Sequence, residues 1–195
     1  MPLAAAAVQA ILTGDRGAEG QLGQFSDNVL RDCKVVSCEP QRLVVTLPVT
    51  ARITNSSANL HGGASCTLVD TLTSAALLIN DFRMSVTIDL HVTCVSAAPL
   101  GSRLEVESTV EQAGKSILFT SCRIFTLGER GKRTLVATGV HTKKVVAGER
   151  AKPQMALLSH GGRRTAGGRA ARARARARDL TDDGSSARLH QRLVP

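Results

Sequence analysis

Hydrophobic and polar residues alternate along six stretches of this chain, and a longer stretch between them follows another pattern. The alternating stretches, typical of strands with one covered face, are residues 34–38, 42–49, 84–94, 102–112, 116–127 and 133–146. Turn-forming residues separate them at 39–41, 98–101, 113–115 and 128–131. Because the connections are short, the first two strands and the last four are expected to form antiparallel neighbours.

Residues 59–80 predict a helix with small and aliphatic side chains on most of its faces, which is typical of a buried helix. Asn59 is the expected cap and Asn80-Asp81 the expected stop. The order of strand pair, helix and four strands predicts the α+β class, with an antiparallel sheet wrapped around one long central helix. A short Ala-rich helix over residues 1–14, ending at Gly14, is expected to precede it.

Composition changes sharply towards the end of the chain. Residues 147–195 hold 11 of the 25 Lys and Arg but 4 of the 16 Asp and Glu, so this segment accounts for +7 of the net charge of +9. A basic, repetitive segment with few apolar residues is expected to be disordered. We therefore divide the chain into an N-terminal extension (1–24), one domain (25–147) and an Arg-rich tail (148–195). Because most of the net charge lies in the tail, the high isoelectric point alone does not indicate a nucleic-acid-binding protein.

The five cysteines are dispersed and include no C-x-x-C pair. This spacing argues against a zinc module and against a secreted disulfide framework, so we expect reduced thiols, no metal, and an intracellular protein of the cytoplasm or mitochondrion. Cys66 and Cys122 are expected to pack in the core. No apolar run approaches the ~20 residues that span a bilayer.

Two features of the predicted helix could carry chemistry. Asp70 lies midway along an otherwise uncharged segment, and a carboxylate in such a place must be hydrogen-bonded, paired or solvated in a cavity. Gly62-Gly63 stands near the start, where backbone N–H groups lack partners and could bind a substrate oxygen. Taken separately, each also fits an ordinary structural role: Asp70 could be satisfied by a neighbouring hydroxyl, and the glycines could permit a tight turn.

Gly62 and Asp70 are eight residues apart, which is ~12 Å along a helix and about 80° around it. One helix therefore cannot readily bring both groups to the same reacting carbon. Two antiparallel copies could place Gly62 of one opposite Asp70 of the other. If these residues act together, the protein should be at least a dimer with two symmetry-related sites.

The spacing of Asn55, His61-Gly62-Gly63 and Asp70, written N-x5-HGG-x6-D, resembles the pattern of hotdog-fold acyl-CoA thioesterases of the acyl-coenzyme A thioesterase thirteen and phenylacetyl-CoA thioesterase type. The resemblance covers roughly residues 25–146 and includes the strands around VTIDLHVTC and ATGVHTKK. It implies a hydrolase that splits acyl-CoA into free CoA and a carboxylate. It also implies a dimer of dimers, with CoA as part of the substrate rather than a bound cofactor.

The resemblance implies roles for individual residues. The Gly62 N–H would polarise the thioester carbonyl, and Asp70 of the partner subunit would activate water or attack directly. Asn55 would orient water or carbonyl, and His61 would fix the loop. Thr87 stands where the family has a serine that holds the water.

Further positions are candidates for substrate contact. Asp89 and His141 match recurring polar positions of the family, and Gly63 adjoins the predicted carbonyl site. Lys143 and Lys144 are our candidates for the CoA phosphates, although exposed lysines are the default for such residues.

Two other functions remain open at this point. The domain could be a non-catalytic hotdog scaffold whose Arg-rich tail binds RNA or anionic membrane, in which case deleting residues 150–195 would abolish a salt-dependent interaction. It could also be a hydroxyacyl-thioester dehydratase, although an acid on the helix and glycine donors suit attack on a carbonyl better. The sequence leaves the acyl chain length and the choice of aliphatic or aryl substrates open.

Overall fold

The computed structural model describes residues 4–13 and 25–150, and of residues 147–150 it describes only the backbone. Its helices are α1 (Ala5–Thr13), α2 (Asp27–Leu30) and α3 (Gly62–Leu78), with short 3-10 turns at Ala51–Ile53 and Glu129–Gly131. Its strands are β1 (Lys34–Glu39), β2 (Arg42–Pro48), β3 (Arg83–Cys94), β4 (Arg103–Ala113), β5 (Ile117–Leu127) and β6 (Arg133–Arg150). The predicted helix stop at Gly14 and nearly all of the predicted tail lie outside the described residues.

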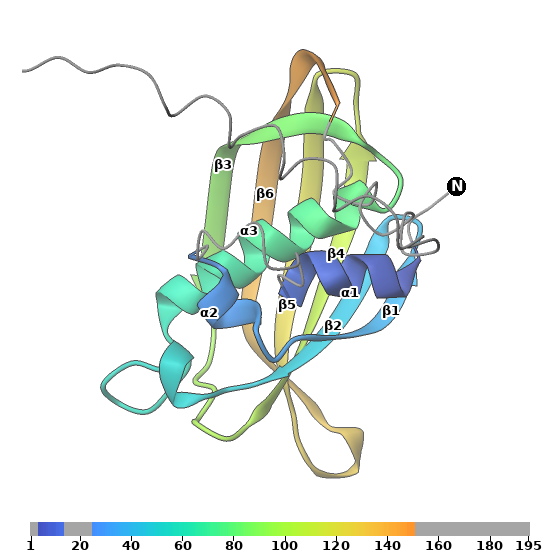
Figure 1. Ribbon diagram of the computed structural model, residues 1–195. Coiled ribbons are helices and arrows are strands. Elements are labelled where there is room, and N and C mark those ends of the chain that lie inside the picture. Colours follow the sequence, from blue (N-terminus) through green and yellow to red (C-terminus); the bar gives the residue numbers. More distant parts are fainter. Residues whose placement is uncertain (1–3, 14–24, 151–195) are drawn as a thin grey trace, which may run out of the picture. The chain divides into compact units, whose positions relative to one another are not determined.

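The six strands form one antiparallel sheet in the order β1-β2-β4-β5-β6-β3, and α3 lies across one face of it (Figure 1). The predicted class and order of elements are therefore confirmed. β6 continues to Arg150, three residues past the predicted end of the domain. Among the described residues, no helix combines the length and apolar character that crossing a bilayer requires.

The core lies between α3 and the sheet. Leu68, Val69 and Leu72 of α3 are fully buried and belong to one cluster with inward-facing side chains of β2, β4 and β5. Gly139 of β6 lies against this helix, because a Cβ built there would come within 2.6 Å of Val69 Cγ1. This close approach brings β6 next to the segment of α3 that carries Asp70.

The N-terminal helix is tied to the sheet by one side chain. Gln9 Nε2 donates to the Cys33 carbonyl at 2.7 Å, and Gln9 Oε1 accepts the Val35 N–H at 2.6 Å. Val8 and Leu12 of the same helix are buried in the main cluster. The predicted N-terminal helix is therefore part of the domain's core packing.

Two details of the central helix differ from expectation. It begins at Gly62 with His61 as cap, whereas Asn59 pairs with Pro99 in an isolated bridge, so the predicted cap was wrong. The helix is also not covered on every side, because Gly62, Gly63 and Cys66 are exposed. The reason is topological: β3 is an edge strand, and the face of α3 beside that edge has no further strand to cover it.

Candidate active site

Asp70 lies on an incompletely covered strip of α3. Gly63, Cys66, Asp70 and Ser74 recur every three or four residues, so they share one face of the helix. The Asp70 side chain is 47% exposed, so its expected burial is corrected to half-burial in the single chain. Cys66 is exposed, so the expectation that it packs in the core is wrong, whereas Cys122 is buried as expected.

Three side chains from three elements meet at the Asp70 carboxylate. Thr87 Oγ1 of β3 lies 3.4 Å from Asp70 Oδ1 and 2.9 Å from His141 Nε2 of β6. His141 Nε2 lies 3.5 Å from the same carboxylate oxygen. The structure thus brings together three residues that are far apart in the sequence, all of them candidates from the sequence.

A β-bulge selects which residue of β3 joins this group. Thr87 pairs with Lys143 and Asp89 pairs with Thr142, so β3 has one extra residue at this point. Without this extra residue, Thr87 and Asp89 would lie on the same face of the sheet. With it, Thr87 faces the helix, and the exposed Asp89 lies beside Thr142 on the opposite face. Asp89 is therefore separated from the Asp70 carboxylate by the sheet.

His141 is held at both ring nitrogens. It is fully buried, and its Nδ1 lies 2.7 Å from Thr73 Oγ1, which is also 2.7 Å from the Val69 carbonyl. Burial lowers the pKa of His141 below its usual 6.5 and Lys143 lowers it further, whereas the negative charges of Asp70 and, across the sheet, Asp89 act in the opposite direction. A neutral imidazole follows at neutral pH, and in either tautomer it orients Thr87 beside Asp70.

Lys143 adds a buried cation to the same region. Its Nζ donates to Ser74 Oγ at 2.9 Å, and Ser74 in turn donates to the Asp70 carbonyl at 2.7 Å. Burial lowers the pKa of Lys143, and the negative charge of Asp70 partly offsets this. The side chain is directed to the helix, and Lys144 is the member of the pair that is exposed.

The start of α3 combines a histidine cap with an open glycine. His61 Nδ1 accepts the Gly63 N–H at 2.9 Å, and a Cβ on Gly63 would press against that ring at 3.0 Å. A side chain at position 63 would therefore crowd the cap. Gly62 is different: a Cβ there would meet nothing within 4 Å, and among the described residues no hydrogen bond uses its N–H. This donor is free to bind a ligand.

Asn55 organises the loop that precedes the helix. Its Oδ1 accepts the N–H groups of Ser57 and Asn59 at 3.0 and 3.1 Å, so the amide oxygen is committed to the loop. Any contact of Asn55 with a substrate would therefore use the amide NH₂ group.

Sequence reasoning missed Thr73 and Ser74, which hold His141 and Lys143. Their positions three and four residues after Asp70 were the available signal, since such residues share a helix face.

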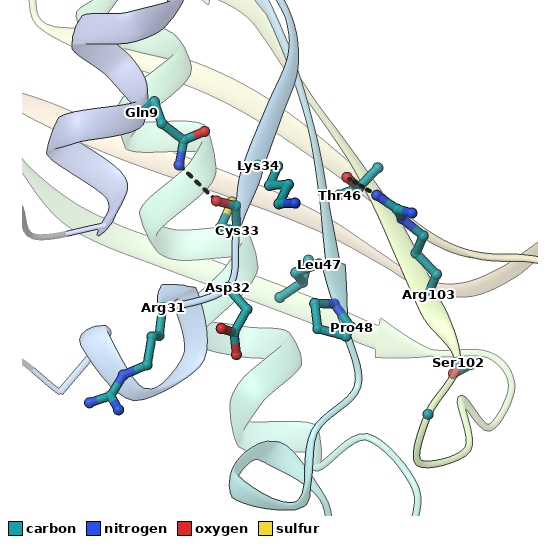
Figure 2. A pocket seen from close by; sticks show the side chains of 11 residues that line it. Gln9, Arg31, Asp32, Cys33, Lys34, Thr46, Leu47, Pro48, Ser102 and Arg103 are labelled. Atoms are coloured by element: carbon teal, nitrogen blue, oxygen red, sulfur yellow. Dashed lines mark hydrogen bonds between the residues drawn. The ribbon is translucent and has the colours of Figure 1, made fainter.

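A cavity of about 400 Å³ adjoins Asp70 and is lined by Phe25, Ser26, Cys66, Thr67, Asp70, Thr71 and Leu90. A larger cavity of about 780 Å³ lies between α1, the start of β1 and the adjoining ends of β2 and β4 (Figure 2). Its polar lining includes Gln9, Lys34 and Arg103, and Arg103 reaches Thr46 at 3.4 Å. None of the site residues expected from the sequence lines this larger cavity, so the chemistry is expected at the Asp70 site.

Comparison with known proteins identifies the family. The Thioesterase superfamily model matches residues 58–132. Acyl-coenzyme A thioesterase 13 of Mus musculus is 33% identical over 118 residues, which cover 60% of this chain and 82% of the mouse protein. The chain belongs to the thioesterase superfamily.

Solved structures of this superfamily have the same fold. Zebrafish thioesterase superfamily member 2 matches with a TM-score of 0.63 and 28% identity, over 74% of this chain and 99% of the zebrafish chain. The Mus musculus member 2 structure matches with a TM-score of 0.63 and 27% identity, over 75% and 100% of the two chains. The resemblance and the hotdog fold class expected from the sequence are confirmed, and the protein is assigned, as predicted, to the thioester hydrolases.

Proposed function

We propose that this protein hydrolyses acyl-CoA thioesters to free CoA and a carboxylic acid. The name of its mouse relative supports acyl-CoA as the substrate, since that protein is an acyl-coenzyme A thioesterase. The observation that carries the proposal is the half-exposed Asp70 carboxylate beside Thr87, His141 and a cavity. CoA enters as part of the substrate and leaves as product, and the reaction requires no metal or resident cofactor.

The complete site would be shared between two copies of the chain. Gly62 and Asp70 stand on one helix eight residues apart, so they are ~12 Å apart along its axis. The edge strand β3 offers a surface for the second copy: Val86 and Ile88 are 50% and 53% exposed, and Met84 is exposed too. Exposed apolar residues on an unpaired edge favour association, and a twofold axis would place Gly62 of one protomer near Asp70 of its partner.

The chemistry follows from the groups present. The Gly62 N–H binds the thioester oxygen at the positive end of α3 and stabilises the charge that develops there. The partner's Asp70 takes a proton from a water molecule, and the water oxygen attacks the carbonyl carbon. The carbon–sulfur bond then breaks, and the CoA thiolate takes up the proton from Asp70. Thr87, held by His141, orients the carboxylate and the water.

The phosphates of CoA need cations outside this buried region. Lys144 remains our candidate for one such contact, because it follows Lys143 on β6 and is exposed. Lys143 is directed to Ser74, so we do not assign it to the nucleotide.

Replacing Gly62 by Pro tests the oxyanion donor with little disturbance of the helix. Gly62 is the first helical residue, where Pro is favoured, and His61 before it is extended, as a residue before Pro requires. Gly62→Ala is the matched control, since it also adds a Cβ but keeps the N–H. Release of free thiol from acyl-CoA should fall by about 10²–10³ more in the Pro variant than in the Ala variant. Equal rates in the two variants would refute this role of the N–H.

A single turnover in ¹⁸O-labelled water tests the role of Asp70. With Asp70 as general base, the carboxylic acid released in the first turnover contains one labelled oxygen. An unlabelled first product would mean that the Asp70 carboxylate itself attacks the carbonyl.

A further inference from the structure

A second, smaller cavity lies one helical turn beyond Asp70. It has a volume of about 130 Å³ and lies between the second half of α3, the start of β3 and the inner faces of β5 and β6. Leu77, Leu78, Met84 and Leu118 form its apolar walls. Its polar lining consists of Ser74, Asp81, Arg83, Ser85 and Lys143.

The side chains that line this cavity include two cations and one carboxylate, and the charge of Asp70 nearby offsets the burial of Lys143 only in part. Arg83 donates to the Asp81 carboxylate from Nε and Nη2, and its Nη1 donates to the carbonyls of Gly114 and Lys115, so this ion pair is satisfied. Lys143 is only 7% exposed, and among the described residues its Nζ has one hydrogen-bond partner, Ser74 Oγ. An ammonium group has three donors, so two remain for a ligand in a place that excludes most water.

We propose that this cavity binds the far end of the acyl group and that Lys143 recognises a terminal carboxylate there. The preferred substrates would then be short ω-carboxyacyl thioesters. This inference rests on the proposed function, because it identifies the substrate class of the same site. Among the described residues Ser74 is the only hydrogen-bond partner of the Lys143 ammonium, and the charge of Asp70 offsets its burial only in part. A buried cation costs free energy unless it is paired, and a substrate carboxylate would supply a direct partner.

The dimensions set the length of the acyl group. Ser74, the partner of Lys143, is four residues after Asp70, so the backbone positions of Asp70 and Ser74 are about 6 Å apart along the helix axis. Four carbon–carbon bonds of about 1.5 Å and one carboxylate oxygen span about that distance in a zigzag chain. An apolar protein cavity of about 150 Å³ can hold one benzene molecule, which has six non-hydrogen atoms. The cavity beside Lys143 is of similar size, so roughly six non-hydrogen atoms fill it. A five-carbon acyl group with a terminal carboxylate satisfies both limits.

The test compares glutaryl-CoA with pentanoyl-CoA, which have the same number of acyl carbons and differ in the terminal carboxylate. The full-length protein should show a higher kcat/KM for glutaryl-CoA, and Lys143→Met should reduce the ratio of the two values by roughly tenfold to a hundredfold. Lys34→Met is the matched control, because it removes an exposed lysine on β1 and should leave the ratio unchanged. A parent enzyme that prefers pentanoyl-CoA, or a ratio unaffected by Lys143→Met, would overturn the inference.

Binding separates this inference from the proposed function. Calorimetric titration of the Asp70→Asn variant with both thioesters measures the preference without turnover. Tighter binding of glutaryl-CoA that depends on Lys143 would support the inference about the acyl group. If the parent enzyme nevertheless released no thiol from either thioester, only the proposed hydrolase function would be refuted. Equal binding of the two thioesters would overturn the inference even if both were hydrolysed.

Discussion

Replacing Gly139 by alanine should disturb the site through the packing of α3 on β6. The added Cβ would lie 2.6 and 2.8 Å from the two γ-carbons of Val69, which is fully buried and precedes Asp70. Valine is stiff at χ1, so it cannot turn aside, and the helix must move by roughly 1 Å to restore ordinary contact. Overpacking of this kind costs about 1–3 kcal/mol, or roughly 3–10 °C in Tm for a domain of this size.

A double-mutant cycle measures that contact directly. Val69→Ala removes two buried methyl groups and should cost about 1.6 kcal/mol in transfer free energy, plus a cavity term. In the double variant the Cβ of residue 139 enters the space left by Val69, so the combined cost should be at least about 1 kcal/mol below the sum of the single costs. The free energy of unfolding is measured by urea denaturation.

Gly128→Ala is the control, because a Cβ there would lie 3.5 Å from the nearest atom, in ordinary contact. The Gly139→Ala variant should also lose thiol-release activity, since Asp70 moves with Val69 relative to Thr87 and His141. Additive effects within about 0.5 kcal/mol would refute the reasoning.

Three further predictions concern the site. His61→Ala should lower the free energy of unfolding, measured by urea denaturation, by about 1 kcal/mol. His61→Asn should retain most of the stability, because Asn is also a good helix cap. Equal losses in the two variants would contradict the role of the Nδ1 acceptor. Burial lowers the pKa of His141, so its contribution to stability is complete above pH 6.5 and declines below that value, where the unfolded state takes up the proton first. His141→Gln should therefore flatten the stability profile in the range just below pH 6.5, and an unchanged slope there would argue against a buried neutral imidazole. Alkylation of Cys66, which lines the same cavity as Asp70, should block the release of CoA thiol. The Cys66→Ser variant should resist the alkylating reagent although Cys94 stays exposed. Inhibition that persists in Cys66→Ser would place the sensitive thiol elsewhere.

The elements of this fold could be predicted where the sequence repeats a simple period. Alternation identified the six strands, and the uncharged segment around Asp70 identified the central helix. The four-residue helix α2 is too short for a periodic signal. The candidate residues Gly62 and Asp70 could be found from spacing, because both lie on one helix whose geometry is regular.

The arrangement around Asp70 depends on features that periodicity does not contain. The bulge in β3 separates Thr87 from Asp89, whereas strict alternation would place both on one face. Lys143 looks like an exposed lysine in the sequence, yet its strand position opposite Thr87 turns it towards α3. Long-range register decides both outcomes, and no local pattern reports it.

The shared site can be tested by mixing two inactive variants, Gly62→Pro and Asp70→Asn. A mixed dimer contains one site with the native Gly62 of one protomer and the native Asp70 of the other, and a second site with both groups altered. After refolding at equal concentrations, random pairing makes half of the dimers mixed, so thiol release from acyl-CoA should recover to roughly a quarter of the parent rate. If the mixture stays as inactive as the two variants alone, Gly62 and Asp70 do not act together across two subunits.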